Sequence, residues 1–383
     1  MKLISERSLA PSLEAALSEM LASRPGLRLL SLDREAAVGT QDTQVGRADL
    51  VAQVVTPSGR HFTLVVKAKA AGEPRIARLA ASQLRALIGS TPLSYGVFAA
   101  PYVSDSTRRV CIEESIGFLD LCGNCLLSFD NVYLSIEGKP NLFRTGRGLK
   151  SLFSRKASRC VRAVLVNPGR DWRVQDLAAE AGVSLGLAFN TKTLLLNAEY
   201  VAEKGKGPNR RFRLRKPEEL LLEWSRNYSY TDNPSTAYYS LDDTRTLEHR
   251  LAKYCRENSV TYAFTLTSGA ALVAPMLRYD TAFAYVAGNQ DALASALGLK
   301  RVETGANLVL MEPYDEGVFY GVRETGLEAA AAEGVPAPSG RVVSDVQLYL
   351  DLKSYKARGQ EAADTLLEQN LKPQWRTNIT AAK

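Results

Sequence analysis

The 383-residue sequence predicts a multidomain protein of mixed α/β and α+β architecture. Three observations support this prediction. The length suits two or three domains, each large enough to bury a hydrophobic core of its own. Amphipathic helical segments alternate with apolar strand segments in the first and last thirds of the chain. Between these thirds, two short helical segments precede two strand segments that are rich in arginine. We expect domains at residues 1–140, 154–228 and 240–370.

The first domain begins with an amphipathic helix over 7–23, where Leu9, Leu13 and Leu17 recur at helical spacing. The segments that follow are strands at 48–55 and 61–69, a helix at 74–87 and an apolar strand at 94–100. A further α/β portion ends near Gly138. The order helix, strand, hairpin strand, helix, strand resembles the core of the PD-(D/E)XK restriction-endonuclease-like fold.

Active nucleases of that fold need an Asp on one strand and an acidic-x-Lys on the next, because two carboxylates hold the divalent metal. Asp49 and Lys69 match the first acid and the lysine, but the remaining acidic position is Lys67. A lysine there repels a cation, so we predict no metal and no cleavage. One alternative stays open, in which Glu14 supplies the second acid and the chain is a metal-dependent nuclease targeted to DNA by its middle domain.

The middle domain has the segment order of a winged helix-turn-helix. A helix over 157–166 stops at AsnProGly, a second covers 174–181, and Gly182 follows where a left-handed residue ends a helix. Ser184 occupies the N-cap of the next helix, with Ala188, Leu195 and Ala198 on its inner face. Two strands at 200–204 and 210–215, joined by a turn at 205–209, form a basic hairpin, and a helix over 217–224 closes the domain.

The positive charge of the chain is local. Residues 147–216 hold sixteen Lys and Arg against five Asp and Glu, whereas the remainder holds 32 against 36. A local basic module predicts a polyanion partner, and double-stranded DNA fits a winged helix. The expected DNA-binding residues are Ser184, Asn190, Lys192 and Thr193 on the helix that Ser184 caps, and Lys204, Lys206, Arg210, Arg211 and Arg213 on the hairpin. A solvated hairpin on a packing or dimerisation domain is the alternative.

The last domain opens with a helix over 246–256, followed by a strand, a small-residue turn and a helix over 262–275, and a strand over 279–286. This order resembles the opening of the nucleotidyltransferase fold. Active transferases need two acids one residue apart on the second strand to bind magnesium, and Asp280 has no such companion. We therefore predict no catalytic residue and no cofactor in this domain either.

The cysteine and histidine content and the hydropathy of the chain count against a disulfide-rich protein, a zinc protein and a membrane protein. Five cysteines do not form a disulfide framework in a chain of this length. Cys122 and Cys125 form one CxxC, but the chain has only two histidines, His61 and His249, so we expect small core residues rather than a zinc site. No stretch is long and apolar enough to span a membrane, and we expect a cytoplasmic protein.

Several short sequence segments resemble those of transcriptional regulators of the AbiEi type, the antitoxins of type IV toxin–antitoxin systems. They lie at 65–74, 99–104, 117–125, 305–319, 346–352 and 358–367. The resemblance implies an antitoxin that represses its own promoter and counters a nucleotidyltransferase toxin without forming a stable complex with it. A third interpretation, in which the outer domains are protein-interaction surfaces, stays open, as do the operator sequence and the oligomeric state.

Overall fold

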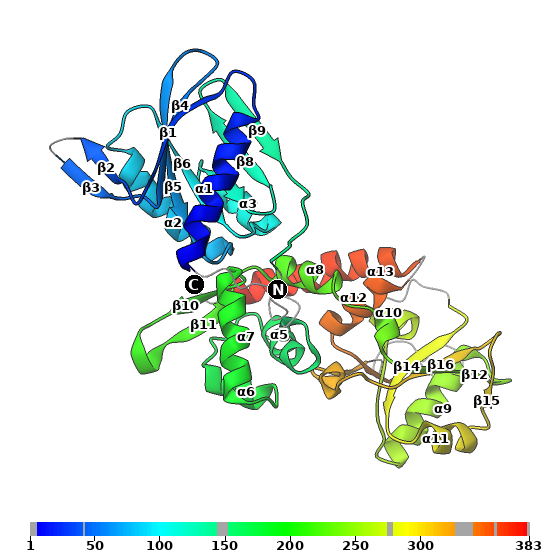
Figure 1. Ribbon diagram of the computed structural model, residues 1–383. Coiled ribbons are helices and arrows are strands. Elements are labelled where there is room, and N and C mark those ends of the chain that lie inside the picture. The colour runs from blue at the N-terminus through cyan, green and yellow to red at the C-terminus, as the bar shows by residue number, and fades with distance from the viewer. Residues whose placement is uncertain are drawn as a thin grey trace. The chain divides into compact units, whose positions relative to one another are not determined.

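The computed structural model describes residues 6–40, 43–143, 152–273, 279–325, 340–355 and 358–380 (Figure 1). The chain divides into two compact units. Unit 1 comprises Met1–Gly148 with Leu196–Glu199, and unit 2 comprises Leu149–Leu195 with Tyr200–Lys383. A glycine-rich, basic segment of the sequence at 141–153 connects the first two expected domains, and it lies largely outside the described residues, which omit 144–151.

Unit 1 is a sheet with helices on both faces. Its helices are α1 (Glu6–Ala22), α2 (Pro74–Ile88) and α3 (Asp105–Glu113). Its strands are β1 (Arg28–Arg34), β2 (Ala37–Thr40), β3 (Thr43–Arg47), β4 (Leu50–Val55), β5 (His61–Ala68), β6 (Ser94–Ala100), β7 (Gly117–Asp120), β8 (Cys125–Phe129) and β9 (Val132–Ile136). In the described part of unit 1 the main sheet has the order β1-β4-β5-β6-β7-β8-β9, and β2 pairs with β3.

Side-chain alternation along the central strands divides the core between the two faces of this sheet. Leu64 and Val66 of β5 pack on the side of α1, together with Leu13 and Leu17 of that helix. Val65 between them packs on the opposite side with the buried face of α2. Strands β5 and β6 are parallel, whereas β4 and β5 are antiparallel. The helix, strand, hairpin strand, helix, strand order predicted from the sequence is therefore present (Figure 1).

Unit 2 begins with the winged helix-turn-helix. Its elements are α5 (Arg155–Val166), α6 (Val174–Glu180), α7 (Leu185–Asn197), β10 (Val201–Lys204), the 3-10 turn η1 (Gly207–Asn209), β11 (Arg211–Leu214) and α8 (Pro217–Ser225). These bounds agree with the predicted helices and hairpin to within about two residues. Helix α5 is amphipathic and buries most of its length, with Val161, Ala163 and Val164 fully inside.

The C-terminal part of unit 2 is a second β-sheet with its own helices. Its helical elements are η2 (Tyr230–Asp232), α9 (Thr244–Glu257), α10 (Leu266–Val273), α11 (Gln290–Ala296), η3 (Glu316–Phe319), α12 (Asp345–Ser354), α13 (Arg358–Leu366), the π-helical η4 (Leu367–Leu371) and α14 (Lys372–Thr380). Its strands are β12 (Ser235–Tyr239), β13 (Thr261–Phe264), β14 (Ala282–Ala287), β15 (Lys300–Arg301), β16 (Leu308–Met311), β17 (Arg323–Thr325) and β18 (Gly340–Val342). Over the described residues they pair in the order β15-β12-β16-β14-β13-β18-β17.

A buried polar network joins the winged helix to this C-terminal part. Arg162 of α5 is fully buried and stacks its guanidinium over the Trp224 ring, with 4.9 Å between Cζ and the ring centroid. Its Nη2 donates to Oε1 of Gln347 at 2.5 Å, and Nε2 of Gln347 donates to Oδ1 of Asp351 at 2.9 Å. Gln347 and Asp351, both on α12, are also fully buried. One amide thus bridges a buried cation and a buried carboxylate.

The carboxylate of Asp351 also accepts hydrogen bonds from hydroxyl groups in the C-terminal part of unit 2. The hydroxyls of Thr265, Tyr228 and Tyr285 donate to its carboxylate at 2.5, 2.6 and 3.0 Å. Burial raises the pKa of Asp351 to about 6, although these hydrogen bonds, with that from Gln347, act in the opposite direction.

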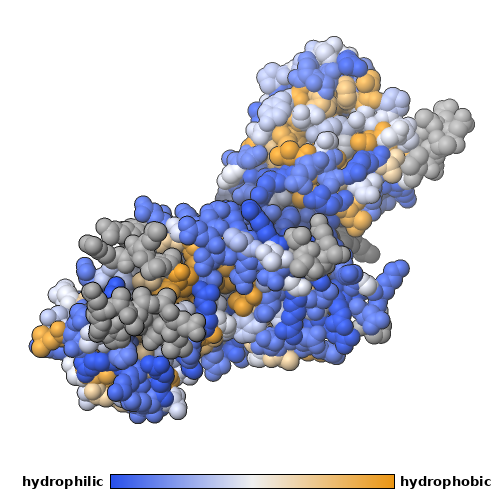
Figure 2. All heavy atoms as spheres, turned by 180° about the vertical axis from the view of Figure 1, so that it is seen from behind, coloured by the Kyte–Doolittle hydropathy of each residue, from blue (hydrophilic) through white to orange (hydrophobic). Residues whose placement is uncertain are grey.

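No described helix is both long enough and apolar enough to cross a lipid bilayer. Hydrophilic residues predominate on the face of the molecule seen in Figure 2, where hydrophobic residues are exposed in small groups. Scattered exposure of this kind is normal for a folded protein surface.

Candidate nucleic-acid interface

The turn between α6 and α7 has the backbone that its sequence requires. Gly182 has φ of +60°, a left-handed conformation that glycine adopts at little cost. The N–H of Val183 donates to the carbonyl of Ala178, which ends α6. Ser184 then caps α7, because its Oγ accepts the N–H of Leu187 at 3.3 Å. The helix-turn-helix predicted here is present.

The wing is the antiparallel pair of β10 and β11, in the register Val201 with Leu214 and Lys204 with Arg211. Phe212 and Leu214 are buried, and the main chain of Phe212 pairs with that of Trp172. Arg211 and Arg213, which alternate with them along β11, point away from this core, as period-2 alternation requires. The buried side chains of Phe212 and Leu214 therefore hold the wing to the rest of the winged-helix fold.

The candidates on α7 fall into two groups. Ser184 and Asn190 are exposed, and Thr193 is half-buried with its hydroxyl donating to the carbonyl of Phe189 at 2.9 Å. Lys192, by contrast, is only 7% exposed, and its ammonium is bound to the carboxylate of Glu203 on β10. In this position Lys192 ties α7 to the wing, and Glu203 neutralises its charge.

The candidates on the wing are divided in the same way. Arg213 makes two contacts to the carboxylate of Asp171, with Nε at 2.7 Å from Oδ1 and Nη2 at 2.6 Å from Oδ2. Arg210 is well exposed and lies 3.9 Å from Glu203. Lys204 and Lys206 are exposed and Arg211 is half-buried. Among the described residues, these last three have no carboxylate partner.

A hollow of about 760 Å³ lies where α6, α7 and the wing meet. Two candidates line it, Asn190 and Arg210. The other lining residues, which the sequence reasoning did not select, are Arg173, Val174, Gln175, Leu185, Gly186 and Phe189. The signal for Leu185 and Phe189 was available in the sequence, since they are four residues apart on a helix whose inner face was already assigned.

The nuclease-like positions of unit 1 form an ion pair. Nζ of Lys67 lies 3.7 Å from Oδ1 of Asp49 and donates to the carbonyl of Arg47 at 2.6 Å. Oδ2 of Asp49 accepts the N–H of Ala68 at 2.7 Å. Lys69 is half-buried, and Glu14, the alternative acid, is bound by Arg34. Over the described residues, no group of three or more His, Cys, Asp or Glu is arranged to hold a metal ion.

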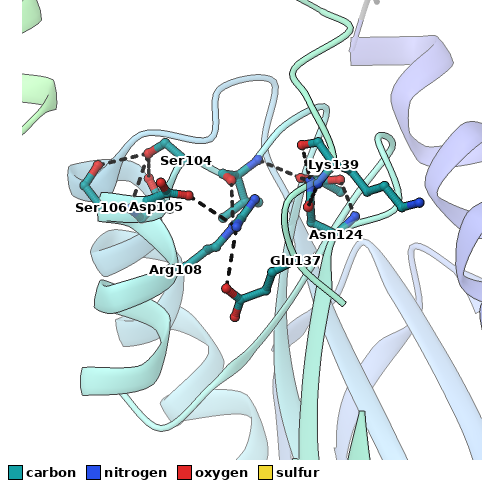
Figure 3. Close-up of polar contacts among 10 residues, drawn as sticks. Ser104, Asp105, Ser106, Arg108, Asn124, Glu137 and Lys139 are labelled. Atoms are coloured by element: carbon teal, nitrogen blue, oxygen red, sulfur yellow. Dashed lines mark hydrogen bonds and ion pairs between the residues drawn. The ribbon is translucent and has the colours of Figure 1, made fainter. Parts of the chain in front are cut away.

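The AspLeuCysGlyAsnCys phrase forms a hydrogen-bonded turn between β7 and β8. The buried carboxylate of Asp120 accepts the N–H groups of Val103, Cys122 and Asn124 at 3.1, 2.9 and 2.9 Å. Oδ1 of Asn124 accepts the N–H of Lys139 at 2.8 Å, as Figure 3 shows. Nearby, Arg108 reaches Asp105 and Glu137 at 3.2 and 3.8 Å (Figure 3). These contacts give the phrase a structural role.

The two cysteines of this phrase pack into the same turn. Cys125 is buried in the core under α1, and Cys122 is half-buried with its Sγ accepting the N–H of Leu142 at 3.4 Å. Burial raises the pKa of both thiols. Both therefore sit as uncharged side chains that fill space.

The comparisons with known proteins bear chiefly on the C-terminal part. Residues 213–372 match the model of the family described as "Transcriptional regulator, AbiEi antitoxin, Type IV TA system". The resemblance predicted from the sequence is confirmed over these residues, which run from the end of the wing through η4. No curated protein matches the chain.

Three solved structures match a smaller part. A repair endonuclease from Pyrococcus abyssi is 16% identical, with a TM-score of 0.21, over 28% of this chain and 46% of that one. A complex of EndoMS with double-stranded DNA is 22% identical, with a TM-score of 0.20, over 28% of this chain and 44% of that one. The chain thus spans less than half the length of the structures it matches.

Proposed function

We propose that this chain is a sequence-specific, double-stranded DNA-binding transcriptional regulator that serves as the antitoxin of a type IV toxin–antitoxin system and represses its own promoter. The observation that carries the proposal is the outer surface of the winged helix. An exposed recognition helix with Asn190 lies beside a wing whose Lys204, Lys206 and Arg211 lack carboxylate partners among the described residues. The AbiEi match over residues 213–372 supports the regulatory role.

The predicted residues have two kinds of role in this proposal. Asn190 faces the major groove, where an amide pairs with the adenine edge, and exposed Ser184 reaches a base or phosphate while it caps α7. Lys204, Lys206, Arg210 and Arg211 bind phosphates. Lys192 and Arg213 act indirectly, because Glu203 and Asp171 hold them and so fix the wing against the helices.

The outer domains do not catalyse a reaction in this proposal. The ammonium of Lys67 stands beside Asp49, where a nuclease of this fold would hold a cation. The family resemblance supplies the expected antagonist, a nucleotidyltransferase toxin countered in the cytoplasm without a stable complex.

The experiment that tests the proposal is fluorescence anisotropy of the full chain with a labelled duplex spanning its own promoter, against a scrambled duplex. Salt is varied from about 50 to 200 mM, a range over which phosphate-driven binding weakens steeply. Promoter binding that survives salt better than scrambled binding supports the regulator. Equal, salt-labile binding to both duplexes contradicts it, and magnesium-dependent cutting of plasmid DNA would favour the nuclease.

A matched pair of double variants tests the wing. The variant Lys204→Ala with Lys206→Ala removes two phosphate contacts, so the slope of log K against log salt becomes shallower by about 1.8. The control, Lys253→Ala with Arg301→Ala, removes the same charge from exposed positions on α9 and β15. Its slope stays at the wild-type value. Equal slopes for both double variants would contradict the wing assignment.

A further inference from the structure

The outward face of α7 is apolar where it faces the hollow. Leu185 is 52% exposed and Phe189 is 54% exposed. They are four residues apart, so their side chains lie on the same face of the helix. Both line the hollow, together with Arg173, Gln175 and Arg210. Folding does not account for this exposure, because the inner face of α7 is already occupied by Ala188 and Leu195.

Gly186 leaves the centre of this face open. A Cβ placed on Gly186 would meet no atom within 4 Å. A glycine in a helix costs about 1 kcal/mol relative to alanine, so its presence needs a reason other than helix stability. Glycine lets a helix backbone approach its partner closely. The face therefore combines two apolar side chains with a position suited to close approach.

The charges around this face indicate which partner covers it. Arg173 and Arg210 line the same hollow, and the wing also carries Lys204, Lys206 and Arg211. A symmetric pairing of two such faces would bring these cations against their own copies, and like charges repel. A polyanion that also presents apolar groups would complement both the surrounding cations and the two apolar side chains. The 5-methyl group of thymine is the apolar group that a base pair presents in the major groove.

We propose that Leu185 and Phe189 read thymine methyl groups in the operator while Asn190 bonds to a neighbouring base. This rests on the proposed function, and it specifies the kind of sequence that the helix selects. Residues four apart on a helix have Cβ atoms about 6 Å apart. That distance is close to two base-pair steps of about 3.4 Å. The stretch of operator that one α7 contacts therefore contains two thymines within about two steps of each other.

Deoxyuridine substitution isolates the methyl group. In the promoter duplex each thymine is replaced singly by deoxyuridine, which removes the methyl and leaves base pairing intact, and the full chain is titrated by anisotropy. Wild type loses about fourfold in affinity for each contacted methyl, from the transfer free energy of one such group. Phe189→Ala and Leu185→Ala bind the unmodified promoter more weakly and each becomes insensitive to one of these replacements. Gly186→Gln, which projects into the groove, abolishes promoter preference while circular dichroism stays unchanged.

Each outcome decides the inference. The inference is supported if wild type loses affinity when one or two particular thymines are replaced, and if Phe189→Ala or Leu185→Ala no longer shows that loss. Promoter-specific binding that is unchanged when every thymine is replaced overturns it and leaves the proposed function standing. Absence of promoter preference in wild type contradicts the proposed function, and the inference fails with it. Self-association of the free chain, detected by light scattering and abolished by Phe189→Ala, also overturns it, because a second copy would then cover the face.

Discussion

Asp351→Asn should remove a pH dependence from the stability of unit 2. The carboxyl of Asp351 is fully buried, and burial raises its pKa from 3.8 to about 6. An acid whose pKa is raised by folding binds its proton more tightly in the native state than in the unfolded state. Its contribution to stability is therefore fully present below about pH 4 and is lost as the pH rises through about 6.

The expected change in the free energy of unfolding follows from the size of the pKa shift of Asp351. Each pKa unit corresponds to about 1.4 kcal/mol, so a rise from 3.8 to about 6 corresponds to about 3 kcal/mol of stability lost between pH 4 and pH 7. Asn at this position keeps an acceptor oxygen for the hydroxyls of Tyr228 and Thr265 but carries no charge. Relative to wild type, the variant should therefore gain stability as the pH rises.

Tryptophan fluorescence provides an assay confined to unit 2. The three tryptophans of the chain, Trp172, Trp224 and Trp375, all lie in this unit and are buried. Urea unfolding at a series of pH values between 4 and 7 gives the free energy of unfolding for wild type and variant. The difference between the two proteins removes the titration of all other groups. A difference that stays constant to within about 0.5 kcal/mol across this range would refute the assignment of a raised pKa to Asp351.

Three further perturbations have defined outcomes. Arg162→Met removes the buried cation that donates to Gln347, the residue that in turn donates to Asp351, and should lower the free energy of unfolding of unit 2 by about 3 kcal/mol in the same assay. In combination with Asp351→Asn the total loss should be smaller than the sum of the two single losses, and simple additivity would refute the coupling. Lys67→Glu places a second carboxylate beside Asp49 and should create a Mn²⁺ site with a Kd of about 1 mM by calorimetry, which Lys67→Gln should lack; equal heats from both would be inconsistent with this geometry. Ser184→Ala removes the cap of α7 and should cost about 1 kcal/mol by urea unfolding, whereas Ser295→Ala at the end of α11 should be near neutral.

The elements with clear periodicity were predictable from the sequence. Helices α1 and α2, strands β4 to β6, and the helix-turn-helix with its wing appear within a few residues of their predicted bounds. Strand β1 was missed, because it is an edge strand with a mostly exposed side-chain pattern that shows no alternation. The short β2–β3 hairpin was missed for the same lack of an apolar stripe. Helix α14 lies beyond the expected end of the last domain at residue 370, and it runs to Thr380.

The candidate site was only partly predictable, because basic residues are assigned to DNA by type whereas pairing depends on the tertiary fold. Lys192 and Arg213 look like phosphate contacts in the sequence, but their partners Glu203 and Asp171 come from other elements. Arg173 and Gln175 were not selected, since Arg173 is the N-cap of α6 and Gln175 lies in its first turn, and only the tertiary fold brings them to the same hollow as α7. The same reasoning overlooked Leu185 and Phe189, because apolar residues on a helix are normally assigned to the core.

The charge at position 67 determines what unit 1 does with the carboxylate of Asp49. The N–H of Asp49 donates to the carbonyl of Val66, and this register brings the residue after Val66 beside the Asp49 side chain. An acid at 67 would give two carboxylates that repel each other unless a cation lies between them. Lysine at 67 supplies the positive charge from the chain itself, at 3.7 Å. One side chain therefore places a positive charge beside Asp49 within the strand register that holds both residues.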